Sequence, residues 1–179
     1  MVSVWRNSMS KGYMHIYTGN GKGKTTAAFG LAIRAACAGK KVYIGQFVKD
    51  MKYSETKIVD FLPNIVIEQL GEGCFISKNP TEQDRLVARK ALQKCATILE
   101  SEQYDLVILD EINIALYYDL IDVNEVIDAL EHRKKSIEVV LTGRYAPEKL
   151  IVLADLVTEM KEIKHYYTQG VLSREGFDC

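Results

Sequence analysis

Residues 13–26 read YMHIYTGNGKGKTT, a run of β-prone residues followed by a turn in which every second residue is glycine. The first part, Tyr13–Thr18, predicts a strand. The segment after the turn, Lys24–Ala38, is rich in alanine and predicts a helix, and Gly39 stands where a helix-terminating glycine is expected. A strand, a glycine-rich turn and a helix in this order form the context that a phosphate-binding loop requires.

The turn itself has the chemistry of a phosphate loop. Its glycines allow backbone N–H groups to turn inward around an anion, and the helix N-terminus adds the positive end of its dipole. The Lys24 ammonium would contact phosphate oxygens, and the Thr25 hydroxyl would be placed to bind Mg²⁺. The usual spacing G-x-x-x-x-G-K-[ST] would put a glycine at position 18, but the chain has Thr18 there and begins its loop at Gly19. We therefore expect the loop to hold a polyphosphate along a path different from that in hydrolases; a glycine-rich turn with solvated lysines is the alternative.

The rest of the chain alternates further strands and helices. A helix that begins near Thr81 carries Asp84 three residues later, a weaker relative of the capping box. Strands that alternate with helices predict a mostly parallel sheet of about six strands covered on both faces, so the fold class is α/β with three layers. Ligands bind such sheets beyond the carboxyl ends of the strands. The remaining predicted strands are 41–48, 64–70, 106–109, 137–141 and 156–160, and the remaining predicted helices are 81–102, 122–133 and 147–154.

The composition indicates one globular domain. The chain has 179 residues, of which 47% are hydrophobic, with 23 Lys and Arg against 24 Asp and Glu. We expect a single domain at 13–179, preceded by a separate and flexible N-terminal arm at 1–12. The balanced charge argues against a nucleic-acid partner, and no apolar run approaches the roughly 18 residues of a membrane span or forms a secretory signal. The four cysteines form no C-x-x-C pair, which excludes a zinc ribbon and favours a cytoplasmic protein in a reducing compartment.

Two later strand ends carry polar residues suited to a phosphate site. The sequence LVILDE, residues 106–111, is a buried strand that ends in two carboxylates, and an acidic residue at such a position holds Mg²⁺ in phosphate-loop proteins. Adjacent residues of an extended strand point to opposite sides, so one of Asp110 and Glu111 would serve the metal and the other would orient water or a loop. The sequence LTGR, residues 141–144, ends the next strand, and the planar fork of Arg144 suits phosphate oxygens. A polar strand end and a surface arginine are the alternatives.

Three other features have weaker implications. The segment GEGCFI, residues 71–76, is an apolar tip between glycines that would line a large hydrophobic ligand or pack onto the core. The aromatic clusters Tyr117-Tyr118 and 165–167 lie near predicted loops, and such clusters belong to cores or interfaces more often than to ligand sites. His132 is expected to be a solvated residue at a helix end.

Four segments together resemble one family. They are TGNGKGKTTAAFGLAIRA (18–35), KVYIGQFVK (41–49), LVILDEINIAL (106–116) and LTGRYAPEKLIVLADLVTEMKEIKH (141–165). They are similar to the ATP:corrinoid adenosyltransferases of the phosphate-loop type, and the resemblance runs from about residue 13 to residue 177. The displaced glycine of GNGKGKTT is specific, and its combination with LDEIN and LTGR strengthens the resemblance.

The resemblance implies a RecA-like fold, a homodimer, and transfer of the 5′-deoxyadenosyl group of ATP to the Co(I) of a corrinoid with release of triphosphate. The corrinoid would be cobalamin or cob(I)yrinic acid a,c-diamide, and an electron donor would first reduce Co(II). ATP would lie reversed along the loop relative to hydrolases. Lys24 and Arg144 would stabilise the leaving triphosphate, while Thr25, Glu111 and Asp110 would hold Mg²⁺ or Mn²⁺. The residues implied to bind ATP through the loop are Gly19, Asn20, Gly21, Lys22, Gly23, Lys24, Thr25 and Thr26.

The implied chemistry fits the residues. Co(I) is itself a nucleophile, so its attack on the ribose C5′ needs no protein base, and the chain shows no Ser-His-Asp or Cys-His pattern. Some members of the family carry Phe and Trp where this chain has Cys74 and Ile76. By the same resemblance, residues 1–12 would correspond to a segment that in some members covers the partner's site, although their own sequence does not establish this. A RecA-like ATPase or small-molecule kinase is the alternative function, and a nucleotide- or corrinoid-binding carrier is a third.

Overall fold

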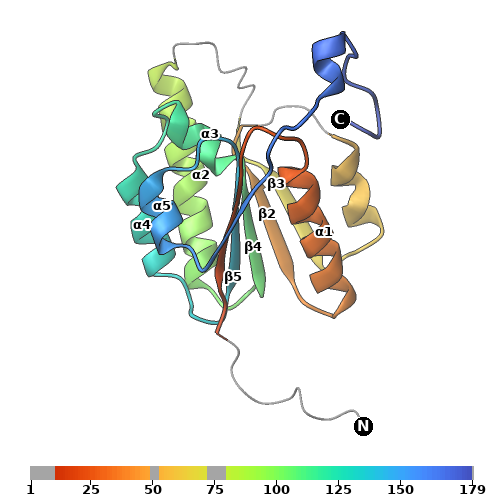
Figure 1. The fold of residues 1–179 in the computed structure, drawn as a ribbon. Coiled ribbons are helices and arrows are strands. Elements are labelled where there is room, and N and C mark those ends of the chain that lie inside the picture. The colour runs from red at the N-terminus through yellow and green to blue at the C-terminus, as the bar shows by residue number, and fades with distance from the viewer. Residues whose placement is uncertain (1–10, 49–52, 72–79, 179) are drawn as a thin grey trace.

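Six parallel strands form one sheet in the order β3-β2-β4-β5-β1-β6 (Figure 1). This computed structural model describes residues 11–48, 53–71 and 80–178. The number of strands and their parallel direction confirm the sheet expected from the sequence. The strands are β1 Met14–Thr18, β2 Val42–Gln46, β3 Ile65–Gln69, β4 Leu106–Asp110, β5 Glu138–Thr142 and β6 Leu156–Glu159.

Helices cover both faces of this sheet, which gives the three expected layers. One face carries the first helix and a 3₁₀ helix, and the other face carries the remaining α-helices (Figure 1). The C-terminal segment, dark blue in Figure 1, lies beyond one edge of the sheet. The α-helices are α1 Lys24–Cys37, α2 Glu82–Glu100, α3 Ile112–Tyr117, α4 Val123–Glu131 and α5 Glu148–Leu153, and the 3₁₀ helices are η1 Ser54–Asp60 and η2 Tyr166–Gln169.

The central strands are apolar on both sides because each face packs against its own hydrophobic cluster. Along β2, Val42 and Ile44 belong to the cluster under α1, whereas Tyr43 belongs to the cluster under α2. Along β4, Ile108 and Val107 divide in the same way. Burial on both faces explains why these strands read as nearly continuous apolar runs rather than as alternating patterns.

Local signals in the sequence predict the ends of two helices correctly. The Thr81 hydroxyl accepts a hydrogen bond from the Asp84 N–H at 3.2 Å, and the Asp84 carboxylate accepts one from the Thr81 N–H at 2.7 Å, so the capping box forms. Gly39 follows α1 with φ +79°, the left-handed conformation expected after a helix end. The expected helix 122–133 appears as α4, and His132 at its end is exposed as predicted.

Other elements differ from the expectations. The helices η1, α3 and η2 were not expected, because each is short and lacks a helical repeat in its sequence. The β2 strand is shorter than the predicted 41–48, and β4 extends one residue further, to Asp110. Residues 1–10 of the expected arm lie outside the described residues, but Gly12 already contacts the domain, since its N–H donates to the Lys135 carbonyl at 2.7 Å. No helix in the described part of the chain has the length and apolarity of a membrane span.

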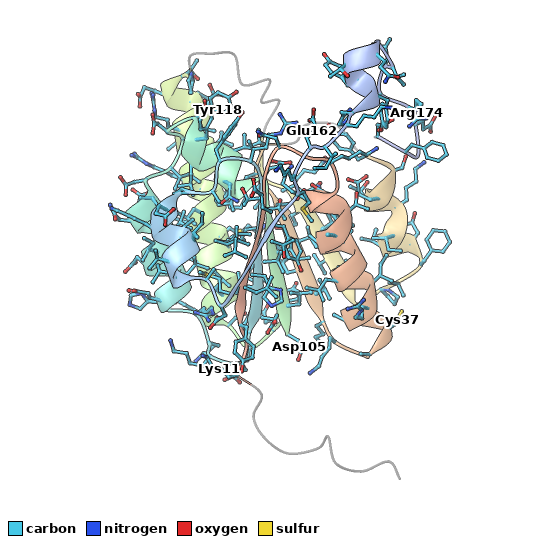
Figure 2. All side chains as sticks on the ribbon, viewed as in Figure 1. Lys11, Cys37, Asp105, Tyr118, Glu162 and Arg174 are labelled. Carbon is cyan, nitrogen blue, oxygen red and sulfur yellow. The ribbon has the colours of Figure 1, made fainter. Side chains whose placement is uncertain are left out.

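The parallel topology brings the decisive polar segments together. The phosphate loop follows β1, and the sequences LDE and LTGR follow β4 and β5, which lie beside one another between β2 and β1. The carboxyl ends of these strands therefore meet at the edge of the sheet near Glu162 and Arg174, while Lys11 and Asp105 mark the opposite edge (Figure 2).

Candidate active site

The phosphate loop rests on the backbone that follows β6. The Gly21 N–H donates to the Met160 carbonyl at 2.6 Å, and a Cβ atom added to Gly19 would lie 2.5 Å from the same carbonyl oxygen. Gly19 also has φ +94°, a conformation that disfavours a side chain. Thr18, by contrast, ends β1, and its hydroxyl accepts a hydrogen bond from the Ala146 N–H at 3.3 Å. The first glycine of the loop is therefore needed at position 19 rather than at position 18.

Lys24 lies inside the loop that it belongs to. Its ammonium donates to the Gly19 carbonyl at 2.7 Å and to the Gly21 carbonyl at 2.8 Å, and only 8% of the residue is exposed. Burial lowers the pKa of Lys24, Glu111 opposes this effect, and Arg144 adds to it. The sequence predicted an ammonium group beside the bound phosphates, and these contacts place it within the loop, near both other charged candidates.

A buried carboxylate lies beneath the loop. Asp110 is fully buried and accepts hydrogen bonds from the Thr25 hydroxyl at 3.0 Å, the Thr142 hydroxyl at 2.7 Å and the Gln46 amide at 3.1 Å. The register of the sheet explains part of this set, because Gln46 and Asp110 are direct partners on β2 and β4. Asp110 thus links the loop to the ends of β2 and β5.

Glu111 takes a different direction from the one expected of an extended strand. The strand ends at Asp110, and Glu111 adopts a left-handed backbone with φ 62°, which is uncommon for a residue with a side chain. Its N–H donates to the Thr142 hydroxyl at 2.9 Å, and Glu111 is one of the residues that line the pocket described below. The strict alternation expected from a continuing strand therefore does not apply. Asp110 is buried beneath the phosphate loop, and Glu111 lines the pocket.

The loop after β5 carries Arg144 to the same pocket. Gly143 has φ +127°, and its carbonyl accepts a hydrogen bond from the buried Asn113 amide at 3.2 Å. Tyr145 also has a positive φ of 60° and stacks on Tyr117, with ring centroids 4.1 Å apart. Arg144, between these two fixed residues, is exposed and lines the pocket. Arg144 is therefore exposed at the surface, as one alternative expected, and it also lies where it could bind phosphate.

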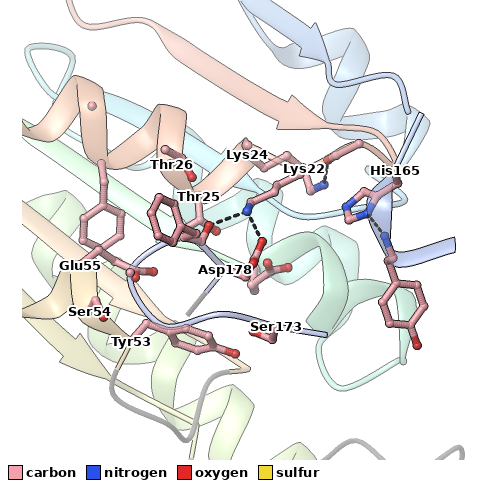
Figure 3. Close-up of a pocket in the computed structure, with 18 of the residues that line it drawn as sticks. Lys22, Lys24, Thr25, Thr26, Tyr53, Ser54, Glu55, His165, Ser173 and Asp178 are labelled. Carbon is pink, nitrogen blue, oxygen red and sulfur yellow. Dashed lines mark hydrogen bonds and ion pairs between the residues drawn. The ribbon is translucent and has the colours of Figure 1, made fainter. Parts of the chain in front are cut away.

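The pocket has a volume of about 960 Å³ (Figure 3). The phosphate loop forms one wall, and an apolar wall comes from α1 and η1, where Phe29, Ile33 and Ile58 contribute side chains. A volume of this size is in the range of small-molecule and cofactor sites. The C-terminal segment forms a third wall, which includes the aromatic run 165–167.

Lys22 reaches this third wall rather than the interior of the loop. Its ammonium donates to the Tyr166 hydroxyl at 2.9 Å and forms an ion pair with Asp178 (Figure 3). Asp178 also accepts a hydrogen bond from Arg174 at 3.0 Å, and the guanidinium of Arg174 lies 4.8 Å from the centre of the Tyr166 ring. The C-terminal segment is therefore tied to the phosphate loop through Lys22.

Comparison with known proteins shows which family the chain belongs to. Residues 10–179 match the family model described as ATP:corrinoid adenosyltransferase BtuR/CobO/CobP. The chain belongs to this family. A corrinoid adenosyltransferase of Sinorhizobium sp is 41% identical over 172 residues, which cover 94% of this chain and 80% of that protein, and one of Escherichia coli strain K12 is 34% identical over 168 residues, which cover 94% and 86%. A crystal structure of the RadB recombinase superposes with a TM-score of 0.51 over 87% of this chain and 77% of the other, at 15% identity, which supports the RecA-like fold alone.

The adenosyltransferase site gathers most, but not all, of the residues expected to form it. Eight of the residues expected to act on ATP or the metal line the pocket: Gly21, Lys22, Gly23, Lys24, Thr25, Thr26, Glu111 and Arg144. Gly19, Asn20 and Asp110 are not among the lining residues: Asn20 is exposed, and Asp110 is fully buried. Cys74 and Ile76 lie outside the described residues.

Several residues of this site had not been expected from the sequence. The aromatic run 165–167 was assigned to a core or an interface, and the structure instead puts all three side chains on the pocket wall. Gln46 and Asp178 were not singled out at all. The polar residue Gln46 at the end of an otherwise apolar strand was the signal available for the first, whereas nothing local marks Asp178 as a partner of Lys22.

Proposed function

We propose that the protein transfers the 5′-deoxyadenosyl group of ATP to the Co(I) of a corrinoid and releases triphosphate. One observation carries the proposal: the phosphate loop of a chain that belongs to the corrinoid adenosyltransferase family forms a wall of a pocket of about 960 Å³. That pocket combines cationic, acidic and apolar walls, which suits a charged nucleotide beside a large, mostly apolar ring system.

The reaction needs alignment and charge stabilisation rather than proton removal. The electron pair of Co(I) forms a bond to the ribose C5′, the bond from C5′ to the triphosphate oxygen breaks, and its electron pair leaves with the triphosphate. No proton has to be taken from the nucleophile. The protein then contributes by holding C5′ near the cobalt and by stabilising negative charge on the leaving group.

The residues of the phosphate loop suit the second task. The Lys24 ammonium, buried within the loop, would exchange the carbonyls of Gly19 and Gly21 for phosphate oxygens when ATP binds. The N-terminus of α1 contributes backbone N–H donors and the positive end of the helix dipole. Arg144, which lines the same pocket, would contact the triphosphate with its planar fork.

The residues near Thr25 fit a magnesium ion. Within the described part of the chain no cluster of three or more His, Cys, Asp or Glu side chains forms a metal site, and the donors at the loop are oxygen atoms. Mg²⁺ prefers oxygen ligands and keeps several waters and phosphate oxygens. Thr25 and Glu111 would hold the ion directly, and the buried Asp110 would act through the Thr25 hydroxyl, to which it is hydrogen-bonded at 3.0 Å. Bound Mg²⁺ would neutralise charge on the triphosphate.

The resemblance to the family extends the proposal to the assembly and its supply of electrons. We infer a homodimer in the cytoplasm, an electron donor that reduces Co(II), and cobalamin or cob(I)yrinic acid a,c-diamide as the acceptor. The orientation of ATP, reversed along the loop, belongs to the same proposal and is consistent with the requirement for glycine at position 19 rather than 18.

The test is a reconstituted reaction. The protein is incubated with ATP, Mg²⁺ and chemically reduced cobalamin, and the products are examined for a light-sensitive Co–C bond and for free triphosphate. Formation of both in equal amounts supports the proposal. Release of ADP and phosphate alone would indicate an ATPase or a kinase, and tight binding of ATP without turnover would indicate a carrier.

A further inference from the structure

A buried amide at the end of β2 has one polar atom without a hydrogen-bond partner among the described residues. Gln46 is 0% exposed, and the residues before it on the same face of the strand, Val42 and Ile44, are apolar. Burying an amide costs free energy unless its polar atoms are hydrogen-bonded. The Gln46 Oε1 atom has no hydrogen-bond partner among residues 11–48, 53–71 and 80–178. An apolar side chain of the same length would fill this position without placing Oε1 there.

The other end of the amide has a defined partner. Gln46 Nε2 donates to Asp110 Oδ2 at 3.1 Å, between residues that are direct partners on neighbouring parallel strands. The opposite amide orientation would put Oε1 against a carboxylate oxygen, acceptor against acceptor, so chemistry selects the orientation described. Gln46 Oε1 is therefore left without a partner because the amide is oriented to donate to Asp110.

Asp110 is held at both of its oxygens. Oδ2 accepts from Gln46, while Oδ1 accepts from the Thr142 hydroxyl at 2.7 Å and from the Thr25 hydroxyl at 3.0 Å. The hydroxyl proton of Thr25 thus points to Asp110, and this contact fixes the direction in which the lone pairs of Thr25 Oγ1 would meet a cation. A carboxylate that turned about its Cβ–Cγ bond would release this proton and change the direction of those lone pairs.

We propose that Gln46 is a positioning residue for the divalent metal site. It fixes the rotation of the Asp110 carboxylate, and Asp110 in turn orients the Thr25 hydroxyl toward the metal that accompanies ATP. Gln46 contacts neither the metal nor the nucleotide in this arrangement. The inference rests on the placement of Mg²⁺ in the proposed function and adds to it the residue that makes this placement precise. Groups that orient metal ligands change metal affinity or activity by about 10- to 100-fold when mutated.

The test compares ATP binding with and without metal in the full chain. Gln46→Met keeps the length of the side chain, removes the donor to Asp110 and removes the unpaired Gln46 Oε1. We expect the affinity for ATP in Mg²⁺, measured by titration calorimetry without corrinoid, to fall by about tenfold or more. The affinity for ATP in EDTA should change by less than about twofold, because that complex holds no metal for the Thr25 hydroxyl to bind.

Gln69→Met is the matched control. Gln69 is the register partner of Gln46 on β3, one strand further from the phosphate loop, so it receives the same chemical change at the same level of the sheet. We expect both ATP affinities of this variant to equal those of the wild type. If Gln46→Met does not fold, Gln46→Asn withdraws the donor by one methylene and should produce the same loss in Mg²⁺ alone.

Two outcomes would overturn the inference. Equal loss of affinity in Mg²⁺ and in EDTA would make Gln46 a structural residue, and an unchanged affinity in Mg²⁺ would remove it from the metal site. Neither result depends on corrinoid chemistry. A wild-type protein that binds ATP in Mg²⁺ but forms no Co–C bond would instead reject the proposed function and leave the role of Gln46 intact.

Discussion

In the proposed reaction, the Lys24 ammonium would lie beside the triphosphate, on which negative charge develops as it leaves. Removing one well-placed donor from such a site costs on the order of 10²-fold in rate, or about 3 kcal/mol of transition-state stabilisation. We therefore expect Lys24→Ala to lose adenosyl transfer by this factor in single-turnover assays. Lys40→Ala is the control, since Lys40 pairs with Asp105 at 3.1 Å at the opposite edge of the sheet (Figure 2). Near-normal turnover of Lys24→Ala would mean that the triphosphate binds elsewhere.

Of the two acidic residues at the end of β4, Glu111 is the one that lines the pocket. Its left-handed backbone turns it away from the position of an ordinary strand residue, and strain of this kind costs about 1–3 kcal/mol unless the surroundings stabilise it. We expect Glu111→Ala to raise the Mg²⁺ concentration needed for half-maximal activity, because the proposed metal ligand is lost. An unchanged Mg²⁺ dependence of the reaction would exclude Glu111 from the metal site.

Gly143 determines where Arg144 lies. An alanine Cβ there would approach Asn113 Cβ to 2.9 Å, at a φ of +127° that disfavours a side chain. We expect Gly143→Ala to lower the thermal midpoint by several degrees and to weaken ATP binding, since Arg144 moves with the loop. Gly39→Ala supplies the comparison: Gly39 also has a positive φ of +79°, but no atom lies within 4 Å of its added Cβ. That variant should lose stability and keep its affinity for ATP.

At the scale of elements, the C-terminal segment places a carboxylate beside the phosphate loop. Hydrogen bonds from Lys22 and then from Tyr166 hold the pKa of Asp178 below its usual range. A carboxylate with a depressed pKa contributes stability above its unfolded pKa and loses it as the pH falls through the folded value. The contact between Lys22 and Asp178 should therefore persist at neutral pH and weaken only in acid below the usual aspartate range.

The same contact predicts competition between the segment and ATP. Asp178→Asn removes a negative charge from the pocket and releases Lys22, so we expect tighter ATP binding and faster amide hydrogen exchange over residues 165–178. Glu175→Gln makes the same charge change three residues earlier in the segment and should have a much smaller effect on both measurements. Weaker ATP binding in Asp178→Asn would show that the segment helps to hold the nucleotide instead of competing with it.

Elements were predictable from the sequence where the cause of their structure is local. The capping residues Thr81 and Asp84, and the helix-ending Gly39, act within a few positions of the chain, and each appears as expected. The order of the strands was predictable only in part. Parallel pairing was expected from the pattern of elements, whereas the position of β4 between β2 and β5 depends on packing across the whole sheet. The short helix α3 escaped prediction because six residues carry too little helical periodicity.

The residues that line the candidate site were predictable only where their signal is local. Lys24, Thr25 and Glu111 lie in short motifs whose chemistry can be read directly. Gln46 and Asp178 become visible only through contacts with Asp110 and Lys22, which are 64 and 156 positions away along the chain. Such contacts depend on the register of β2 against β4 and on the path of the C-terminal segment, neither of which a local pattern encodes.

At the scale of the whole molecule, the reactivity of the Cys95 thiol can report how often the fold opens. Burial raises the pKa of its thiol to about 12, so folded protein at pH 8 keeps Cys95 protonated and unreactive. Between the usual value near 9 and about 12 the unfolded thiol loses its proton while the folded one keeps it. The free energy of unfolding should therefore decrease as the pH rises through that window.

Alkylation of Cys95 then becomes a test of ATP binding by the entire domain. At pH 8 we expect the exposed Cys37 to react rapidly and Cys95 to react only through opening of the fold, with both sites followed by peptide mass spectrometry. A ligand that binds only the closed fold suppresses opening by a factor of 1 + [L]/Kd, about a hundredfold at one hundred times Kd. ATP with Mg²⁺ should slow the labelling of Cys95 by that factor and leave Cys37 unchanged, whereas Lys24→Ala should lose the protection at the same ATP concentration. Equal protection of Cys95 in Lys24→Ala would mean that the stabilising site for ATP is not the phosphate loop.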